Sequence, residues 1–256
     1  MKLNRDIVRQ LLTLIAILAA FGVNVLTNIA PINGLSIGEI SNTLFKQILI
    51  TPANYAFLIW GLIYTGLISL AAYQAQPNQR QNPTLRRIGY LLTASSGAQI
   101  VWVVLFQTRL FVLSLGAMLL ILLPLIGAYL RLDVVKGAVS RQQKWFVHRP
   151  ISIYFAWISV ATIVNGAIAL DYVGWSGWGV NPQGWTVIMM VIGTAIAATV
   201  TLQRADRVYS GVFVWALGAI AVRHLDTVII AGPASGFAFI LILVMIFSRQ
   251  IRQKST

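Results

Sequence analysis

Long stretches without charged residues constrain the fold of this chain more than any other feature of its sequence. A helix needs about 20 mainly apolar residues to cross the hydrocarbon core of a bilayer, and eight stretches approach that length. They are residues 10–30, 53–75, 88–108, 110–130, 150–170, 184–203, 208–223 and 228–248. The seventh is the shortest uncharged stretch, since Arg207 and Arg223 bound it. We therefore predict an all-α integral membrane protein with about eight transmembrane helices.

The composition agrees with lipid as the solvent. Apolar residues make up 58% of the 256 residues and charged residues only 10%, whereas a soluble domain carries about 25% charged residues. In a soluble protein the net charge of +13 would suggest a nucleic-acid partner. Here the basic residues lie between the apolar stretches, so we expect no nucleic acid. The chain has no cysteine, which excludes disulfides, thiolate metal sites and a cysteine nucleophile.

The basic residues are divided unequally between the two sides of the membrane. If the eight stretches alternate in direction, only Lys46, Arg109 and Arg223 of the 19 lysines and arginines fall on the outer side. The other side receives Lys2, Arg5, Arg9, Arg80, Arg86, Arg87, Arg131, Lys136, Arg141, Lys144, Arg149, Arg204, Arg207, Arg249, Arg252 and Lys254. Cytoplasmic loops carry the excess of lysine and arginine. We therefore predict that both termini are cytoplasmic, and we expect the membrane to be that of a bacterial cell.

The first outer loop, residues 31–52, is long enough for structure of its own. Ser36 and Glu39 have the spacing of a capping box. Apolar residues follow at intervals of four, namely Ile40, Leu44 and Ile48. We predict a short amphipathic helix at the outer interface. Thr51 and Pro52 have the residue types of an N-cap and a first helical position, which predicts that the next helix starts there.

A second outer loop contains Trp175 and Trp178 among glycines. Tryptophan is enriched where a membrane protein passes from lipid to water, so we interpret both residues as part of an interfacial belt. The alternative is that they belong to an outer lid over a binding site.

Aromatic and amide side chains inside the predicted helices are the candidates for a ligand site. They share helix faces in three groups, which are Phe57, Trp60 and Tyr64; Gln99 and Trp102; and Trp157, Ala161 and Asn165. Aromatic rings facing the bundle interior suit a planar hydrophobic ligand, whereas the alternative is ordinary helix packing. The six carboxylates lie at helix ends or in loops, and no nucleophile–base pair is evident. We therefore expect neither an enzyme nor a required cofactor.

These residues resemble the TspO/MBR family, the translocator proteins also called tryptophan-rich sensory proteins. Three ordered elements carry the resemblance, and they are Pro52, Trp60 and Tyr64; the Asn-x-x-Trp-x-x-x-Phe pattern at residues 99–106; and the Tyr-x-Ala-Trp and Thr-x-x-Asn patterns at residues 154–157 and 162–165. The resemblance covers residues 10–171. It departs from the family where Gln99 replaces asparagine and where Met118 falls near an acidic position. The family also has five helices where this chain would have eight.

The resemblance implies a five-helix membrane bundle in residues 1–171, with the short helix of the 31–52 loop over its outer mouth. It leaves residues 172–256 as a three-helix membrane extension with a basic cytoplasmic tail. It further implies a receptor or regulator that binds a porphyrin, another tetrapyrrole or a sterol-like lipid, with a role in stress sensing or tetrapyrrole handling. By position the pocket would be lined by Trp60, Tyr64, Trp102, Trp157, Ala161 and Asn165, with Phe57 and Gln99 on the same faces. The partners would be that ligand and the bilayer, and a homodimer stays open.

Three other functions remain open from the sequence. Eight helices could support a transporter of a tetrapyrrole, a lipid or another hydrophobic solute. A membrane enzyme could act on a bound porphyrin through Trp60 and Trp157. A structural or assembly partner would use the last three helices as its interface.

Overall fold

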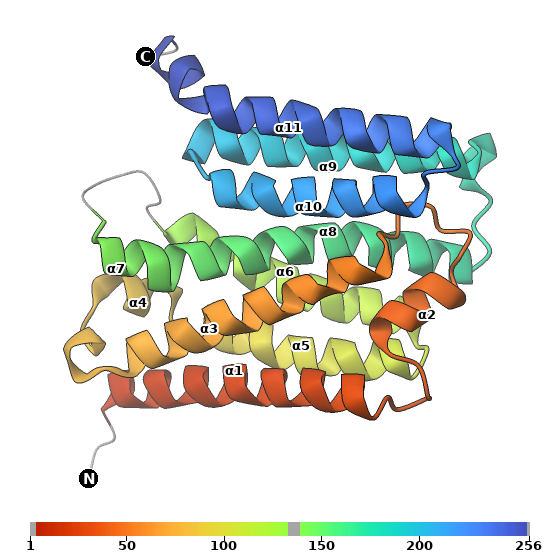
Figure 1. The fold of residues 1–256 in the computed structure, drawn as a ribbon. Coiled ribbons are helices and arrows are strands. Elements are labelled where there is room, and N and C mark those ends of the chain that lie inside the picture. Colours follow the sequence, from red (N-terminus) through yellow and green to blue (C-terminus); the bar gives the residue numbers. More distant parts are fainter. Residues whose placement is uncertain (1–3, 133–138, 255–256) are drawn as a thin grey trace.

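The computed structural model describes residues 4–132 and 139–254, which form helices and connecting loops. Eight long helices run alternately in opposite directions along one axis (Figure 1). They are α1 (Arg5–Ile29), α3 (Ile59–Ala75), α5 (Leu91–Gln107), α6 (Phe111–Arg131), α8 (Arg149–Tyr172), α9 (Pro182–Arg204), α10 (Arg207–Arg223) and α11 (Val228–Lys254). Each coincides with one of the eight apolar stretches. The predicted positions of the long helices are therefore confirmed.

Short helices lie at the ends of this bundle. α2 (Ile37–Thr43) is at one end, and α4 (Pro83–Ile88) and α7 (Arg141–Gln143) are at the other (Figure 1). Four single turns complete the described elements, namely Asn54–Leu58, Pro77–Gln79, Lys144–His148 and Gly177–Gly179. The first of them leads directly into α3, and the third is a π-helical turn that leads into α8.

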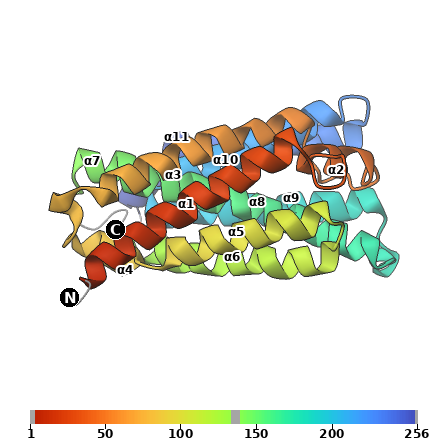
Figure 2. The same ribbon diagram turned by 90° about the horizontal axis from the view of Figure 1, so that it is seen from below.

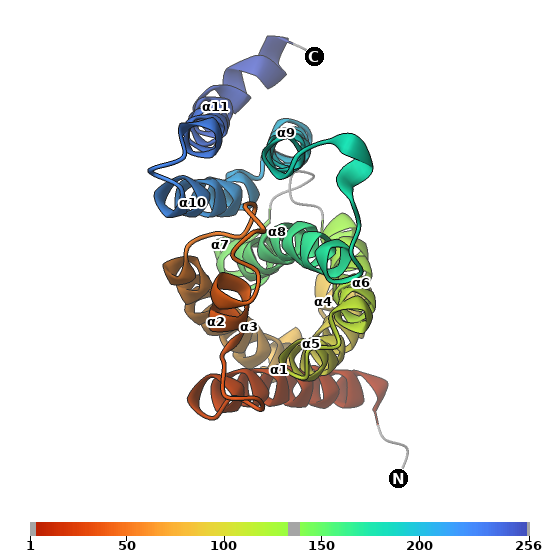
Figure 3. The ribbon, with the colours of Figure 1, turned by 90° about the vertical axis from the view of Figure 1, so that its right-hand side faces the viewer.

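Five of the long helices form a ring, which Figure 3 shows end-on. Around the ring, α1 packs on α3 and α5, α5 on α6, α6 on α8, and α8 on α3. α1 crosses its neighbours obliquely (Figure 2), and α2 lies at one end of the ring, to the side of its centre (Figure 3). The last three helices lie outside the ring, where α10 packs on α8 and on both α9 and α11. α10 is therefore the main link between the ring and the last two long helices.

Six helical segments are long and apolar enough to cross a membrane. They are Arg5–Ile29, Asn54–Ala75, Phe111–Arg131, Arg141–Tyr172, Pro182–Arg204 and Val228–Ser248. The other two long helices, α5 and α10, have 17 residues each, which is about 26 Å at a rise of about 1.5 Å per residue. The hydrocarbon core of a bilayer is about 30 Å thick, so length and composition identify six candidate spans, and the predicted number of eight is not confirmed.

The basic residues gather at one end of the bundle. The start of α1, the α3–α4 connection, the end of α6, the start of α8 and the α9–α10 connection all lie at the end that holds both termini (Figure 1). These are the segments that carry the predicted cytoplasmic charges. Lys46, Arg109 and Arg223 follow α2, follow α5 and end α10, at the opposite end. Lys2, Asp133 and Lys136 lie outside the described residues, as do the side chains of Arg249, Arg252 and Lys254.

The capping box in the first outer loop is confirmed. The backbone N–H and the hydroxyl of Ser36 both donate to Oε2 of Glu39, at 2.8 and 2.7 Å, and the N–H of Glu39 donates to the Ser36 hydroxyl at 3.3 Å. These hydrogen bonds hold the pKa of the Glu39 carboxyl below its usual value. The helix is nevertheless shorter than the spacing of apolar residues suggested, because α2 ends at Thr43 and leaves Leu44 and Ile48 outside it.

The predicted cap at Thr51 is wrong. The next helical turn begins at Asn54, after Ala53, and no side chain caps it. The segment before it is bound to α10 instead. The Thr51 carbonyl accepts a hydrogen bond from Nη1 of Arg223 at 3.1 Å, and the N–H of Ala53 donates to the Ala219 carbonyl at 3.1 Å. Contacts with a helix more than 150 residues later along the chain therefore outweigh the local capping signal.

Candidate functional site

The predicted interior residues converge inside the five-helix ring. Six of the eight line one small cavity of about 30 Å³, and they are Phe57, Trp60, Trp102, Trp157, Ala161 and Asn165. They come from α3 and the turn before it, from α5 and from α8. Trp60 is 8% exposed and Trp157 is 3% exposed. Both indoles therefore face the interior of the protein, as the helix faces predicted.

Hydrogen bonds fix part of this interior cluster. Nε1 of Trp102 donates to Oδ1 of Asn165 at 2.8 Å, and Nδ2 of Asn165 donates to the hydroxyl of Ser114 at 3.1 Å. Sequence reasoning missed Ser114, although a serine within the apolar stretch of α6 is a signal for a polar contact between helices. These two hydrogen bonds join α5, α8 and α6, which is what the packing alternative predicts.

Two predicted residues lie beside this cavity rather than in its lining. The hydroxyl of Tyr64 donates to the Ala20 carbonyl of α1 at 3.2 Å, and its ring stacks on Trp60 with centroids 5.6 Å apart. Oε1 of Gln99 accepts a hydrogen bond from the Tyr154 hydroxyl at 3.4 Å, and Nε2 of Gln99 has no partner within the described residues.

The interior cavity is small for a ligand. A volume of about 30 Å³ is the share of one water molecule in the liquid, whereas pockets for small molecules measure about 300–1,000 Å³. A planar tetrapyrrole between Trp60 and Trp157 would require α3 and α8 to move apart. In the structure the side chains of the interior cluster pack the helices of the ring against one another. That they also form a ligand pocket stays a prediction.

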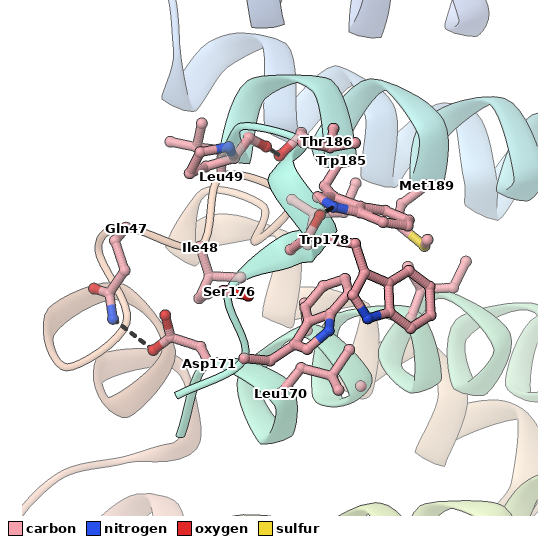
Figure 4. Close-up of a pocket in the computed structure, with 18 of the residues that line it drawn as sticks. Gln47, Ile48, Leu49, Leu170, Asp171, Ser176, Trp178, Trp185, Thr186 and Met189 are labelled. Atoms are coloured by element: carbon pink, nitrogen blue, oxygen red, sulfur yellow. Dashed lines mark hydrogen bonds between the residues drawn. The ribbon is translucent and has the colours of Figure 1, made fainter. Parts of the chain in front are cut away.

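A much larger cavity, of about 560 Å³, lies outside the ring (Figure 4). It is bounded by the second half of α8, the start of α9, residues 47–50 of the first outer loop and residues 175–180 of the second. We call it the outer cavity. Its lining is Gln47, Ile48, Leu49, Ile50, Thr162, Ile163, Gly166, Ala167, Leu170, Asp171, Trp175, Ser176, Gly177, Trp178, Val180, Pro182, Trp185, Thr186 and Met189.

Three indoles form one wall of the outer cavity. The ring centroids of Trp175 and Trp185 are 5.0 Å apart, and the Trp178 ring is 5.4 Å from Trp175 and 6.3 Å from Trp185. We call these residues the tryptophan cluster. Nε1 of Trp185 donates to the Gly177 carbonyl at 2.7 Å, so the loop is held against the first turn of α9.

The loop needs unusual backbone geometry to place these rings. Gly177 has a φ of 75° and Trp178 a φ of 51°. Left-handed backbone is ordinary for glycine but costs a residue with a Cβ about 1–2 kcal/mol. Trp178 is also 80% exposed, so the protein holds a large apolar ring at its surface in a strained conformation.

The polar side of the outer cavity is formed by Asp171 and Gln47. Nε2 of Gln47 donates to Oδ2 of Asp171 at 2.7 Å (Figure 4). Asp171 is the only charged residue among the described residues that line the cavity. Sequence reasoning placed Asp171 at a helix end and gave it no role. It did weigh a lid for the tryptophans of this loop, and the lining positions of Trp175 and Trp178 are those the lid alternative requires.

Comparison with known proteins gives one match. A family model described as TSPO-like protein matches residues 10–247. The match continues past residue 171, where the motifs stopped, and includes α9, α10 and most of α11. Neither a curated protein nor a solved structure matches the chain. The apolar helices and the family match together show an integral, multi-pass membrane protein.

Proposed function

The chain belongs to the TSPO-like protein family, and from this premise we propose that it is a membrane receptor that binds a hydrophobic small molecule. The outer cavity carries the proposal. Its volume of about 560 Å³ lies within the range of about 300–1,000 Å³ that is typical of small-molecule sites. Its lining is mainly apolar, with few polar groups, which is the usual composition of such a site. The proposal is one of binding, without a catalytic step.

The position of the outer cavity supports a ligand that reaches it from the bilayer. The cavity lies between α8 and α9, and both helices belong to segments long and apolar enough to cross a membrane. Its loop residues lie at the end of the bundle opposite the basic residues (Figure 1). We propose that this end is the outer side, that all eight long helices span the membrane, and that both termini are cytoplasmic.

A tetrapyrrole, which the family resemblance implied, remains a candidate for this receptor. It would occupy either the outer cavity in its present form or the interior cluster after α3 and α8 separate. The two sites share no lining residue, so substitutions can distinguish them.

The test is a binding measurement on the purified protein with substitutions that fill one site or the other. Gly166 lines the outer cavity, and a Cβ built on it meets no atom within 4 Å, so we expect the ring of Gly166→Phe to occupy part of the cavity. The matched control is Gly61→Phe, because Gly61 also has open space around it and lines neither cavity. Porphyrin and sterol binding by equilibrium dialysis should fall at least roughly tenfold in Gly166→Phe, a loss of about 1.4 kcal/mol, and should be unchanged in Gly61→Phe.

The interior alternative makes the opposite prediction. Trp157→Leu keeps an apolar side chain but removes stacking that is worth about 0.5–1.5 kcal/mol. If Trp157→Leu weakens binding and Gly166→Phe does not, the ligand occupies the interior cluster. If no hydrophobic probe binds the unsubstituted protein, the receptor proposal is wrong.

A further inference from the structure

We infer that the ligand of the outer cavity is a cationic amphiphile, a molecule with a protonated amine at one end and an aromatic or aliphatic body. This inference rests on the receptor proposal and specifies the chemical class of the ligand. Its basis is the juxtaposition of one carboxylate, three indole rings and an otherwise uncharged lining in a single cavity.

The charge of the cavity selects the head group. Asp171 is negative, and within the described residues no lysine, arginine or histidine lines the cavity. No ion pair of Asp171 with a lysine or arginine exists in that part of the chain either. Gln47 donates to Oδ2 only, and Oδ1 accepts no hydrogen bond from the described residues. A carboxylate that keeps one oxygen open attracts an ammonium group and repels a carboxylate or a phosphate.

The tryptophan cluster favours the same head group. The face of an indole ring carries negative electrostatic potential, and tryptophan is the side chain that attracts cations most strongly in this way. Trp175, Trp178 and Trp185 all line the cavity that Asp171 lines, and the ring centroids of Trp178 and Trp185 lie 5.4 and 5.0 Å from that of Trp175. The strained backbone of Trp178 is consistent with a functional position, since such strain concentrates at ligand-binding sites.

The rest of the lining selects the body of the ligand. Ile163, Ala167 and Met189 line the part of the cavity that lies along α8 and α9. These side chains offer apolar contact and no hydrogen bond. An amine held at Asp171, near the end of α8, therefore places the remainder of the molecule along the two helices, toward the middle of the membrane.

The experiment compares two probes with the same skeleton, pyrenemethylamine and pyrenemethanol, by equilibrium dialysis at neutral pH with the full-length protein in detergent. The amine should bind roughly 3- to 10-fold more tightly than the alcohol, because an ion pair with a partly exposed carboxylate and a contact with an indole face are each weak. Asp171→Asn should remove the part of this preference that the carboxylate contributes, while leaving alcohol binding intact. Added salt should reduce the preference in the unsubstituted protein.

Asp226→Asn is the matched control. Asp226 is an exposed aspartate in the α10–α11 connection, at the same end of the bundle, and it does not line the cavity. The same change of charge should therefore leave the preference for the amine unchanged. If Asp171→Asn does not fold, Gln47→Glu replaces it, and the added negative charge should increase the preference.

The possible outcomes separate the two proposals. If neither pyrene probe binds, the inference about the amine is overturned, and the receptor proposal fails as well only if porphyrin and sterol also do not bind. If both probes bind equally and Asp171→Asn changes nothing, the cavity binds hydrophobic molecules but the inference about charge is overturned. If Asp171→Asn and Asp226→Asn reduce the preference equally, the amine responds to the surface charge of the protein, and the inference is again overturned.

Discussion

At the scale of single residues, Trp178 shows a conflict between local and tertiary preference. Its φ of 51° favours glycine, yet the chain places its largest side chain there. The ring gains contacts with Trp175 and Trp185 in return. Local sequence rules therefore fail at Trp178, and such failures concentrate at functional or strained positions.

The strain at Trp178 can be measured by comparing two truncations. Both Trp178→Gly and Trp178→Ala remove the ring contacts, but only alanine keeps a Cβ in left-handed backbone. The glycine variant should therefore be more stable than the alanine variant by about 1 kcal/mol. Thermal unfolding in detergent would measure the difference. At Ser176, whose φ is −80°, the order should reverse, and equal stability of the two Trp178 variants would argue against strain.

Among single residues, the sequence identified the interior cluster but not the outer cavity. Trp60, Trp102 and Trp157 were found because each shares a helix face with other aromatic or amide residues. The outer cavity was missed because its lining comes from α8, α9 and two loops that lie far apart in the chain. Polarity gives no help in finding it. In a bilayer, apolar residues cover the outside of the protein as well as its interior, so the pattern that marks a core in water is absent.

At the scale of helices, α10 is the element that the sequence specified least clearly. It is short for a span, but it contacts α8, α9, α11 and the turn before α3. Neighbouring helices, rather than lipid, therefore cover much of its surface. The long helices were otherwise predictable from composition alone, since backbone groups in lipid must satisfy their hydrogen bonds within a helix. Short α2 and the start of α3 depend on tertiary contacts, and their boundaries were predicted less well.

Asp206 fixes the start of α10, and it is only 6% exposed. Its Oδ1 accepts hydrogen bonds from the N–H groups of Val208 and Tyr209, at 3.0 and 3.2 Å. Its Oδ2 accepts from the hydroxyls of Tyr129 at 2.8 Å and Ser152 at 2.6 Å. One carboxylate thus caps α10 and binds it to α6 and α8.

Removal of this carboxylate should loosen the last three helices. Asp206→Ala loses a helix cap and leaves two buried hydroxyls without their acceptor, so we expect a loss of about 2–4 kcal/mol. Asp206→Asn should lose less, because an amide oxygen still accepts. Thermal unfolding in detergent is the measurement. Asp226→Ala, at an exposed loop position, should change stability by less than about 0.5 kcal/mol, and an equal effect of the two alanine variants would contradict this role.

At the scale of the whole molecule, the distribution of charge predicts the orientation in the membrane. The basic ends of the helices lie together with both chain termini (Figure 1), and basic loops stay in the cytoplasm. Reporters fused near residue 140 and after residue 256 should therefore report the cytoplasm, and one near residue 178 should report the outside. A reporter after residue 256 that reports the outside would mean that one of the eight long helices does not span.

The hydrogen bonds of Asp206 also bear on how the protein is made. Synthesis proceeds from the N-terminus, so Tyr129 and Ser152 reach the membrane before the carboxylate that binds them. The carboxylate therefore arrives at a ring whose hydroxyls are already present. The order of residues along the chain thus allows the ring to form first and to act as the template on which the last three helices assemble.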